Sequence, residues 1–267
     1  MQSKNPELCS GFCFSVEIGE LRVEMKQMKL IDSVRIQHEN PWEPYLDGLF
    51  LDRNGGVKFC YKEGRSVVTQ SEDGTKEVWY TPPEGERLEL PYNWTGAAKD
   101  VPPMLRTWRP SDAEIYYFED YTISHTSQWS YVCKKAGEAV WKFKGYAWRY
   151  TTMEQYGDNI YFGTAGQGGY FYLLNLHTGQ PLLKLKTGGT VYIYARRDNR
   201  LYLLQQEKKA YLVCVDLNDG TILERLELPG KADQHSAIRL IGDTIHCVTF
   251  TYRGGPVKDA LWNRVEV

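Results

Sequence analysis

The 267-residue sequence lacks long apolar runs and any marked excess of charge. No stretch approaches the ~18 consecutive apolar residues of a membrane-spanning helix, so we expect no membrane span. Its 32 Lys and Arg against 34 Asp and Glu give a net charge of −2, and the basic residues are scattered. Because a nucleic-acid-binding surface needs clustered basic residues to neutralise phosphates, we expect no nucleic-acid partner.

The N-terminus lacks the apolar core of a secretory signal peptide, since its first seven residues include Lys4, Pro6 and Glu7. We therefore expect the chain as written to be cytoplasmic, unless a targeting segment precedes it in the cell.

Metal-binding and catalytic patterns are also missing. The spacing from Cys9 to Cys13 is not followed by a second cysteine pair or a histidine pair, which a zinc site requires. Other cysteines, such as Cys214, lie in apolar contexts typical of buried thiols. The five histidines are isolated from one another, so no metal site and no catalytic triad can be assembled from local sequence.

Aromatic residues are abundant. They make up 13% of the chain, with 19 Tyr and 8 Trp, whereas there are only 5 Met. Aromatic side chains favour pleated sheets over helical bundles, so the composition predicts an all-β protein.

A repeat is present in the second half of the chain. Three strand-like segments, at 160–164, 170–176 and 181–185, are joined by two turns. The same order recurs 41 residues later, at 201–204, 211–217 and 222–226. A period of this length, with hairpin turns between the strands, is typical of a repeated β-unit.

Further copies flank these two. The strand-like segments of a third copy and of a partial fourth lie at 115–118, 129–133, 140–143, 244–248 and 260–263. Each copy is preceded by a short strand that ends in a polar turn, and such turns fall near residues 19, 54, 113, 158, 199 and 243. The turns indicate about six four-stranded units, or five if the N-terminal unit instead donates its strands to the last one.

A four-stranded unit of this size cannot bury both faces alone, and stacking the units around an axis covers them. We therefore predict that residues 1–267 form a single small β-propeller. A β-sandwich is the alternative, although it would not need the turns to recur in register. The Pro- and Gly-rich segment 81–110 interrupts the repeat and is interpreted as an elaborated loop between two blades.

The segment 172–180 resembles the quinoprotein (PQQ-like) propeller repeat, in which an apolar strand and a Thr-Gly turn precede a strand that often ends in Trp. Segments 211–220 and 131–141 are similar, and the latter retains Trp141. Enzymes of this family hold pyrroloquinoline quinone and calcium at the ring axis, on much longer chains with a vicinal disulfide. This chain has no adjacent cysteine pair, so the resemblance implies a non-catalytic docking propeller without a cofactor.

Candidate binding residues are basic or aromatic groups in two places. The innermost strands line the channel of a propeller, and arginines there, with aromatic neighbours, are suited to an acidic peptide or a small anion. Large rigid side chains in the 81–110 loop are typical interface anchors, although the loop could instead fold back over its own aromatics. The candidates are Trp94, Trp108, Arg109, Trp148, Arg149, Tyr150 and Arg196. For all the basic residues near inner strands the alternative is inter-blade ion pairing with nearby carboxylates, and these residues are Arg106, Arg109, Arg149, Arg196, Arg197 and Arg239.

The resulting hypothesis is a non-enzymatic propeller, of scaffold or antidote type, that presents one face to a protein or peptide. The alternative is a hydrolase or lyase that gathers carboxylates such as Asp47, Asp112 and Asp158 from several inner strands. Aspartates beside Asn or Gly are also ordinary turn residues, which favours the first hypothesis.

Overall fold

The structure is a computed structural model, and it describes the following residues: 27–37, 49–51, 54–63, 65–81, 83–85, 115–127, 130–145, 153–164, 169–188, 194–232, 236–251 and 259–267. None of these stretches contains a helix long and apolar enough to cross a membrane.

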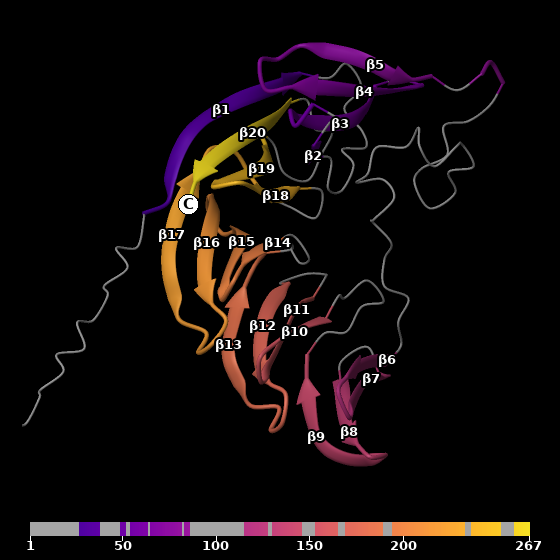
Figure 1. Cartoon of the computed structure of the whole chain (residues 1–267), viewed down its shortest axis with the longest axis vertical. Helices are drawn as coiled ribbons and strands as arrows, with labels where there is room; N and C mark the ends of the chain where they lie inside the picture. The colour runs from indigo at the N-terminus through magenta and orange to yellow at the C-terminus, as the bar shows by residue number, and fades with distance from the viewer. Residues whose placement is uncertain are drawn as a thin grey trace, which may run out of the picture.

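The described residues form five antiparallel sheets of four strands each (Figure 1). Three sheets follow the chain order from inner to outer strand: β6 (Ile115–Phe118), β7 (Tyr121–Ser127), β8 (Ser130–Lys135), β9 (Glu138–Lys144); β10 (Met153–Tyr156), β11 (Asn159–Gly163), β12 (Tyr170–Asn175), β13 (Pro181–Lys186); and β14 (Tyr194–Arg197), β15 (Arg200–Gln206), β16 (Ala210–Asp216), β17 (Ile222–Leu228). A fourth holds β2 (Leu49–Leu51), β3 (Val57–Glu63), β4 (Ser66–Ser71) and β5 (Lys76–Tyr80).

The fifth sheet joins the two ends of the described chain. Its inner strand is β18 (Ile238–Ile241), its middle strands are β19 (Thr244–Phe250) and β20 (Asp259–Glu266), and its outer strand is β1 (Lys29–Gln37). β1 runs antiparallel to β20 from Lys29 opposite Glu266 to Gln37 opposite Asp259. An N-terminal strand therefore completes the last sheet, as the five-unit alternative required, and the described sheets fit that count. The turn expected near residue 19 lies outside the described residues.

The sheets stack face to face along an arc, so that inner strands line its concave side and outer strands its convex side (Figure 1). Four buried clusters fill the interfaces between successive sheets. The order of stacking is the sheet of β6–β9, that of β10–β13, that of β14–β17, the sheet closed by β1, and that of β2–β5. This stacking of four-stranded units is a β-propeller architecture.

In the sheets that have a neighbour on each side, the two middle strands are buried on both faces. In β11, Ile160 and Phe162 face the β6–β9 sheet while Tyr161 faces the β14–β17 sheet. Since side chains alternate along a strand, a strand covered on both sides is apolar throughout. Outer strands such as β13 instead alternate exposed and half-buried side chains. This gradient explains why middle strands gave the clearest sequence signal.

Most predicted strands are confirmed, but the β6–β9 sheet corrects one assignment. Residues 115–118 form the inner strand β6 rather than the second strand, and the turn after it lies at 119–120 rather than near 113. The true second strand, β7, was missed. The reason is physical: its Thr122 and Ser124 lie on the face turned away from the neighbouring sheet, so β7 has no continuous apolar run.

Trp141 links two neighbouring sheets. Its indole N–H on β9 donates to the carbonyl oxygen of Leu176, just after β12, at 2.7 Å. Gly179, in the turn before β13, lies directly against the ring, and a β-carbon there would sit 2.5 Å from Trp141 Cδ2. The Thr-Gly turn of one repeat thus packs against the Trp of the preceding repeat.

The substitution Gly179→Ala is expected to destabilise the protein by about 2 kcal/mol, because the new methyl group meets an indole that its hydrogen bond to Leu176 holds in place. Gly157→Ala is the matched control: Gly157 also has a positive φ, of 53° against 69° for Gly179, but nothing lies within 4 Å of the position that its new methyl group would take. Urea unfolding of both variants separates the contact from the backbone strain. Equal losses would show that the Trp141 contact contributes nothing.

Candidate functional site

A cluster of tyrosines around one arginine lies on the inner strands of two neighbouring sheets and on the middle strand β11. We call it the Arg196 cluster, and it consists of Glu154, Tyr156, Tyr161, Tyr194 and Arg196. Glu154 on β10 is the register partner of Tyr161 on β11, so both side chains leave the same face of their sheet. That face packs against the sheet of β14, which carries Tyr194 and Arg196.

Glu154 accepts two phenolic hydrogen bonds. The Tyr161 hydroxyl donates to Oε2 at 2.5 Å, and the Tyr194 hydroxyl donates to Oε1 at 3.3 Å. Burial, together with the hydrogen bond to Glu154, raises the pKa of Tyr161 above its ordinary value. The phenol therefore stays protonated, and the carboxylate is held between two donors.

Arg196 is exposed and has no carboxylate partner among the described residues. Its Nη1 donates to the Tyr161 hydroxyl at 3.4 Å, and its guanidinium carbon lies 5.8 Å from the centre of the Tyr156 ring. A guanidinium held by neutral partners keeps its charge and several donors available to solvent. This is the feature expected of a site for an anionic group.

The structure places only one of the predicted binding residues. Arg196 lies on an inner strand as expected. The other six, Trp94, Trp108, Arg109, Trp148, Arg149 and Tyr150, lie outside the described residues, as do Asp47, Asp112 and most of the 81–110 loop.

Arg197 follows the inter-blade ion-pair alternative, whereas Arg239 reaches the next sheet through a backbone carbonyl. Arg197 forms an ion pair with Asp243 of the next sheet at 3.0 Å and also donates to the Gly242 carbonyl. Arg239 donates through Nε to the carbonyl oxygen of Leu49, at 3.4 Å, and so reaches the β2–β5 sheet. Two adjacent residues on one strand, Arg196 and Arg197, thus have different roles.

The tyrosines and Glu154 were not identified from the sequence. β10 and β14 are only four residues long, and their partners in the cluster become visible only once the sheets are stacked. A useful signal was nonetheless present, because Tyr156 and Tyr194 each lie close to a predicted polar turn.

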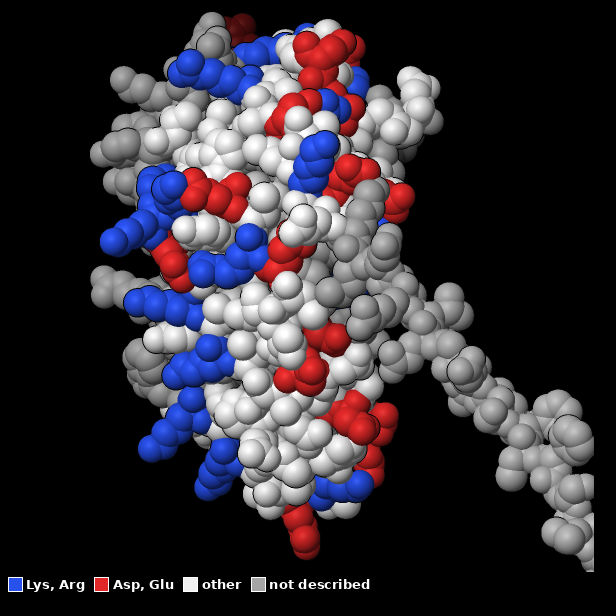
Figure 2. All heavy atoms as spheres, turned by 90° about the vertical axis from the view of Figure 1, so that its left-hand side faces the viewer, with Lys and Arg blue, Asp and Glu red and all other residues white. Residues whose placement is uncertain are grey.

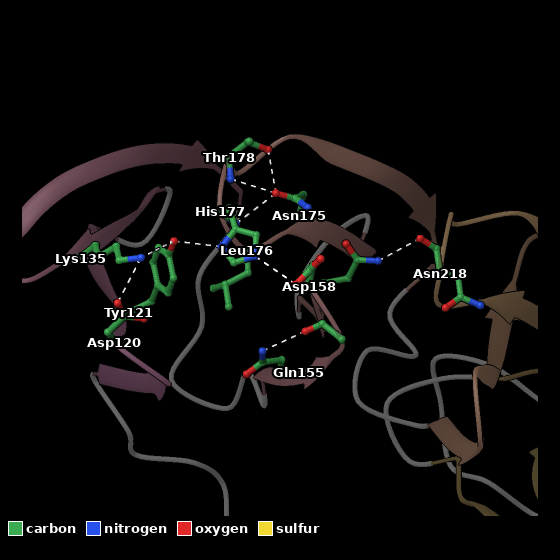
Figure 3. Close-up of polar contacts among 12 residues, drawn as sticks. Asp120, Tyr121, Lys135, Gln155, Asp158, Asn175, Leu176, His177, Thr178 and Asn218 are labelled. Atoms are coloured by element: carbon green, nitrogen blue, oxygen red, sulfur yellow. Dashed lines mark hydrogen bonds and ion pairs between the residues drawn. The ribbon is translucent and has the colours of Figure 1, made fainter.

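A second polar group connects the turns of two sheets (Figure 3). We call it the turn network, and it joins Asp120, Tyr121, Lys135, Asp158 and His177. Lys135 Nζ lies 3.1 Å from Asp120 and donates to the Tyr121 hydroxyl at 3.3 Å. His177 Nδ1 lies 2.9 Å from that hydroxyl, and His177 Nε2 lies 3.1 Å from Asp158 Oδ1.

The turn network has a consistent direction of hydrogen bonding when His177 carries its proton on Nε2. Nε2–H then donates to Asp158, and the Tyr121 hydroxyl donates to Nδ1 while accepting from Lys135. The hydrogen bond between Lys135 and Asp120 raises the pKa of the lysine and lowers the pKa of the carboxyl. Because Tyr121 is buried and its hydroxyl joins Lys135 of one sheet to His177 of the next, we interpret the network as a clamp between the β6–β9 and β10–β13 sheets.

Asp158 bears on the enzyme alternative. Its carboxylate lies in the β10–β11 turn, 80% exposed, and pairs with His177. It is therefore engaged in turn chemistry, as the docking hypothesis expected of such aspartates. Within the described stretches, no three His, Cys, Asp or Glu side chains are grouped closely enough to hold a metal ion.

The convex rim carries exposed lysines. Figure 2 views this side, with basic residues gathered along one edge and acidic residues along the other. Lys142 and Lys144 on β9, and Lys184 and Lys186 on β13, are all exposed. Lys184 lies 4.7 Å from the centre of the Tyr170 ring. The rim is thus a second basic surface, separate from the Arg196 cluster.

Comparisons with known proteins give distant likenesses. No family model and no curated protein sequence matches the chain. Among solved structures, BamB from Moraxella catarrhalis aligns with a TM-score of 0.38 at 12% identity, over 87% of this chain and 62% of BamB. A europium-containing methanol dehydrogenase aligns at 0.39 and 9%, over 84% and 50%. The WD40 propeller domain of Doa1 aligns at 0.35 and 14%, over 76% and 62%. The propeller architecture itself rests on the strand order and stacking of this chain.

Proposed function

We propose that the chain is a non-enzymatic interaction propeller whose Arg196 cluster binds an acidic segment of a protein partner. The observation that carries this proposal is an exposed arginine on an inner strand whose direct contacts are the neutral Tyr161 and Tyr156, while the Glu154 carboxylate is held by the Tyr161 hydroxyl rather than by the guanidinium. Arginine and tyrosine are enriched among the residues that dominate binding energy at protein interfaces. A partner carboxylate could accept two parallel hydrogen bonds from the free edge of the guanidinium.

The exposed apolar groups of β6 lie on another face of the molecule. Tyr117 is 73% exposed and Ile115 is also exposed, but they are the register partners of Thr122 and Ser124 and so leave the side of the sheet that is turned away from the β10–β13 sheet. The proposal therefore rests on the Arg196 cluster itself.

The test compares two variants that each remove one exposed positive charge, Arg196→Ala from the cluster and Lys142→Ala from the rim. Affinity capture from source-cell extract, quantified by mass spectrometry, is expected to lose the specific partner about 30-fold with Arg196→Ala, the scale of a 2 kcal/mol interface residue. Lys142→Ala is expected to retain it. Loss with Lys142→Ala instead would assign binding to the rim, and equal capture by both variants and the unmodified protein would refute the proposal.

We further infer that the repeats belong to the non-catalytic branch of the quinoprotein-type propellers. The packing of Trp141 on Gly179 supports this inference, because it gives the Trp and the Thr-Gly turn of the resembling repeat a shared structural role.

A further inference from the structure

A cavity of about 370 Å³ lies between the β14–β17 sheet and the sheet closed by β1. Its polar wall is formed by Arg200, Tyr202, Cys214 and Glu224, and Met28 and Leu223 contribute apolar surface. It is distant in the fold from the Arg196 cluster, which faces the opposite neighbour, the β10–β13 sheet. Cavities of this size accommodate small-molecule ligands.

Strand register produces the polar wall. Tyr202 on β15 lies opposite Cys214 on β16, and Cys214 lies opposite Glu224 on β17. Register partners in antiparallel strands share a face, so these three side chains form one row. Arg200 precedes Tyr202 by two residues and therefore leaves the same face.

Of the side chains that line the cavity, Arg200 and Glu224 carry opposite charges, and neither forms an ion pair within the described residues. Asp216, the register partner of Arg200, lies on the same face of the sheet but does not line the cavity. Both carboxylate oxygens of Glu224 accept from the backbone N–H of Met28, at 3.1 and 2.9 Å, but this donor is neutral. Arg200 has no carboxylate within ion-pair distance among the described residues. Its guanidinium lowers the pKa of the neighbouring Tyr202 and Cys214, but burial raises both values overall, so both side chains are uncharged. The cavity thus presents a guanidinium and a carboxylate to the same space.

Cys214 lies between the two charges but does not supply a third. Burial raises the pKa of its thiol to about 11, and the Arg200 guanidinium only partly opposes this rise. The side chain is consequently a neutral thiol at physiological pH and acts as part of the cavity wall.

We propose that this cavity binds a free α-amino acid with an apolar side chain. The ligand carboxylate pairs with Arg200, the ligand ammonium pairs with Glu224, and the side chain packs on Met28 and Leu223. A zwitterion satisfies both charges of the wall, whereas a ligand with a single charge leaves one of them desolvated and unpaired.

The test uses L-leucine and two analogues that each lack one charge: 4-methylpentanoate, which has no ammonium, and 3-methylbutylamine, which has no carboxylate. In thermal unfolding of the full chain, L-leucine at ten times its Kd is expected to raise Tm by about 3 °C. Calorimetric titration is expected to show at least ~10-fold weaker binding of either analogue.

Two substitutions test whether Arg200 and Glu224 bind the two charged groups of the ligand. Arg200→Gln is expected to weaken L-leucine binding at least ~10-fold while leaving the weak binding of 3-methylbutylamine unchanged. Glu224→Gln is also expected to weaken L-leucine binding at least ~10-fold, but it is expected to leave the weak binding of 4-methylpentanoate unchanged. If either variant fails to fold, the analogue series on the unmodified protein still decides. No Tm shift with L-leucine at millimolar concentration, or equal affinity for all three compounds, would overturn the proposal.

Discussion

Replacing Trp262 with alanine is expected to lower the free energy of unfolding by about 4 kcal/mol. The indole on β20 is fully buried between the sheet closed by β1 and the β2–β5 sheet. Its N–H donates to Nδ1 of the buried His246 at 3.2 Å. Alanine leaves a cavity between two sheets and also removes a donor from a buried acceptor, so two costs add. Urea denaturation that reports both the midpoint and the slope measures the loss.

Two control variants separate these costs. Trp262→Phe keeps most of the ring but lacks the N–H, so its expected loss is about 1–2 kcal/mol. Val78→Ala removes apolar volume from a side chain that is 67% exposed, and it is expected to change stability by less than about 0.5 kcal/mol. If Trp262→Ala cost no more than Val78→Ala, this interface would not be part of the cooperatively folded core.

Acidification from pH 6.5 to 4 is expected to remove about 3 kcal/mol of stability through His246 alone. Burial, reinforced by the Arg264 guanidinium, lowers the pKa of His246 to about 4, while Asp32 acts in the opposite direction. An unfolded histidine titrates near its ordinary pKa of 6.5. Between the two values the unfolded state binds the proton and the folded state does not, so stability is complete above pH 6.5 and falls as the pH drops.

The hydrogen-bond geometry agrees with a neutral imidazole. Since the Trp262 N–H donates to Nδ1, this nitrogen carries no proton, and the 3.7 Å approach of Glu72 to it is not an ion pair at neutral pH. Protonation of Nδ1 would exchange the Trp262 hydrogen bond for a contact with Glu72, which offsets part of the cost.

Unfolding at pH 7, 5.5 and 4.5 tests this prediction, with His246→Gln as the variant that cannot titrate but retains an acceptor for Trp262. The variant is expected to lose most of the pH dependence in this window. Asp32 changes little in this window, because a carboxyl whose pKa is lowered by its hydrogen bonds with Arg264 keeps its stabilising effect above its ordinary pKa of 3.8 and loses it below that value. An unchanged slope in the variant would assign the pH dependence to other groups.

The fold was predictable where strands are buried on both faces. β11, β12, β15 and β16 have continuous apolar runs, and tight turns with Gly or Asn define their ends, so the sequence located them within a few residues. β7 was missed because only one of its faces is covered by a neighbouring sheet. The pairing of β1 with β20 could only be offered as one of two possibilities, since local sequence does not encode which distant edge a strand will join.

The site was less predictable, for a related reason. Composition drew attention to arginines near inner strands, but it could not distinguish Arg196, which has neutral neighbours, from Arg197, which pairs with Asp243. That distinction depends on which side of a four-residue strand faces which neighbouring sheet. Glu154 and its tyrosines, and the row of Tyr202, Cys214 and Glu224, likewise arise from stacking and register.

The pairing of β1 with β20 also has a consequence for the order of events during synthesis. Asp32 on β1 and Arg264 on β20 are 232 residues apart, and Nε of Arg264 donates to Asp32 at 2.7 Å. At about 5–20 residues per second, a ribosome needs roughly 10–50 s to make the partner strand after the first has emerged. β1 must wait unpaired throughout that interval, so completion of the last sheet is expected to be a late step of folding, and a nascent-chain chaperone has most reason to bind β1 before β20 emerges.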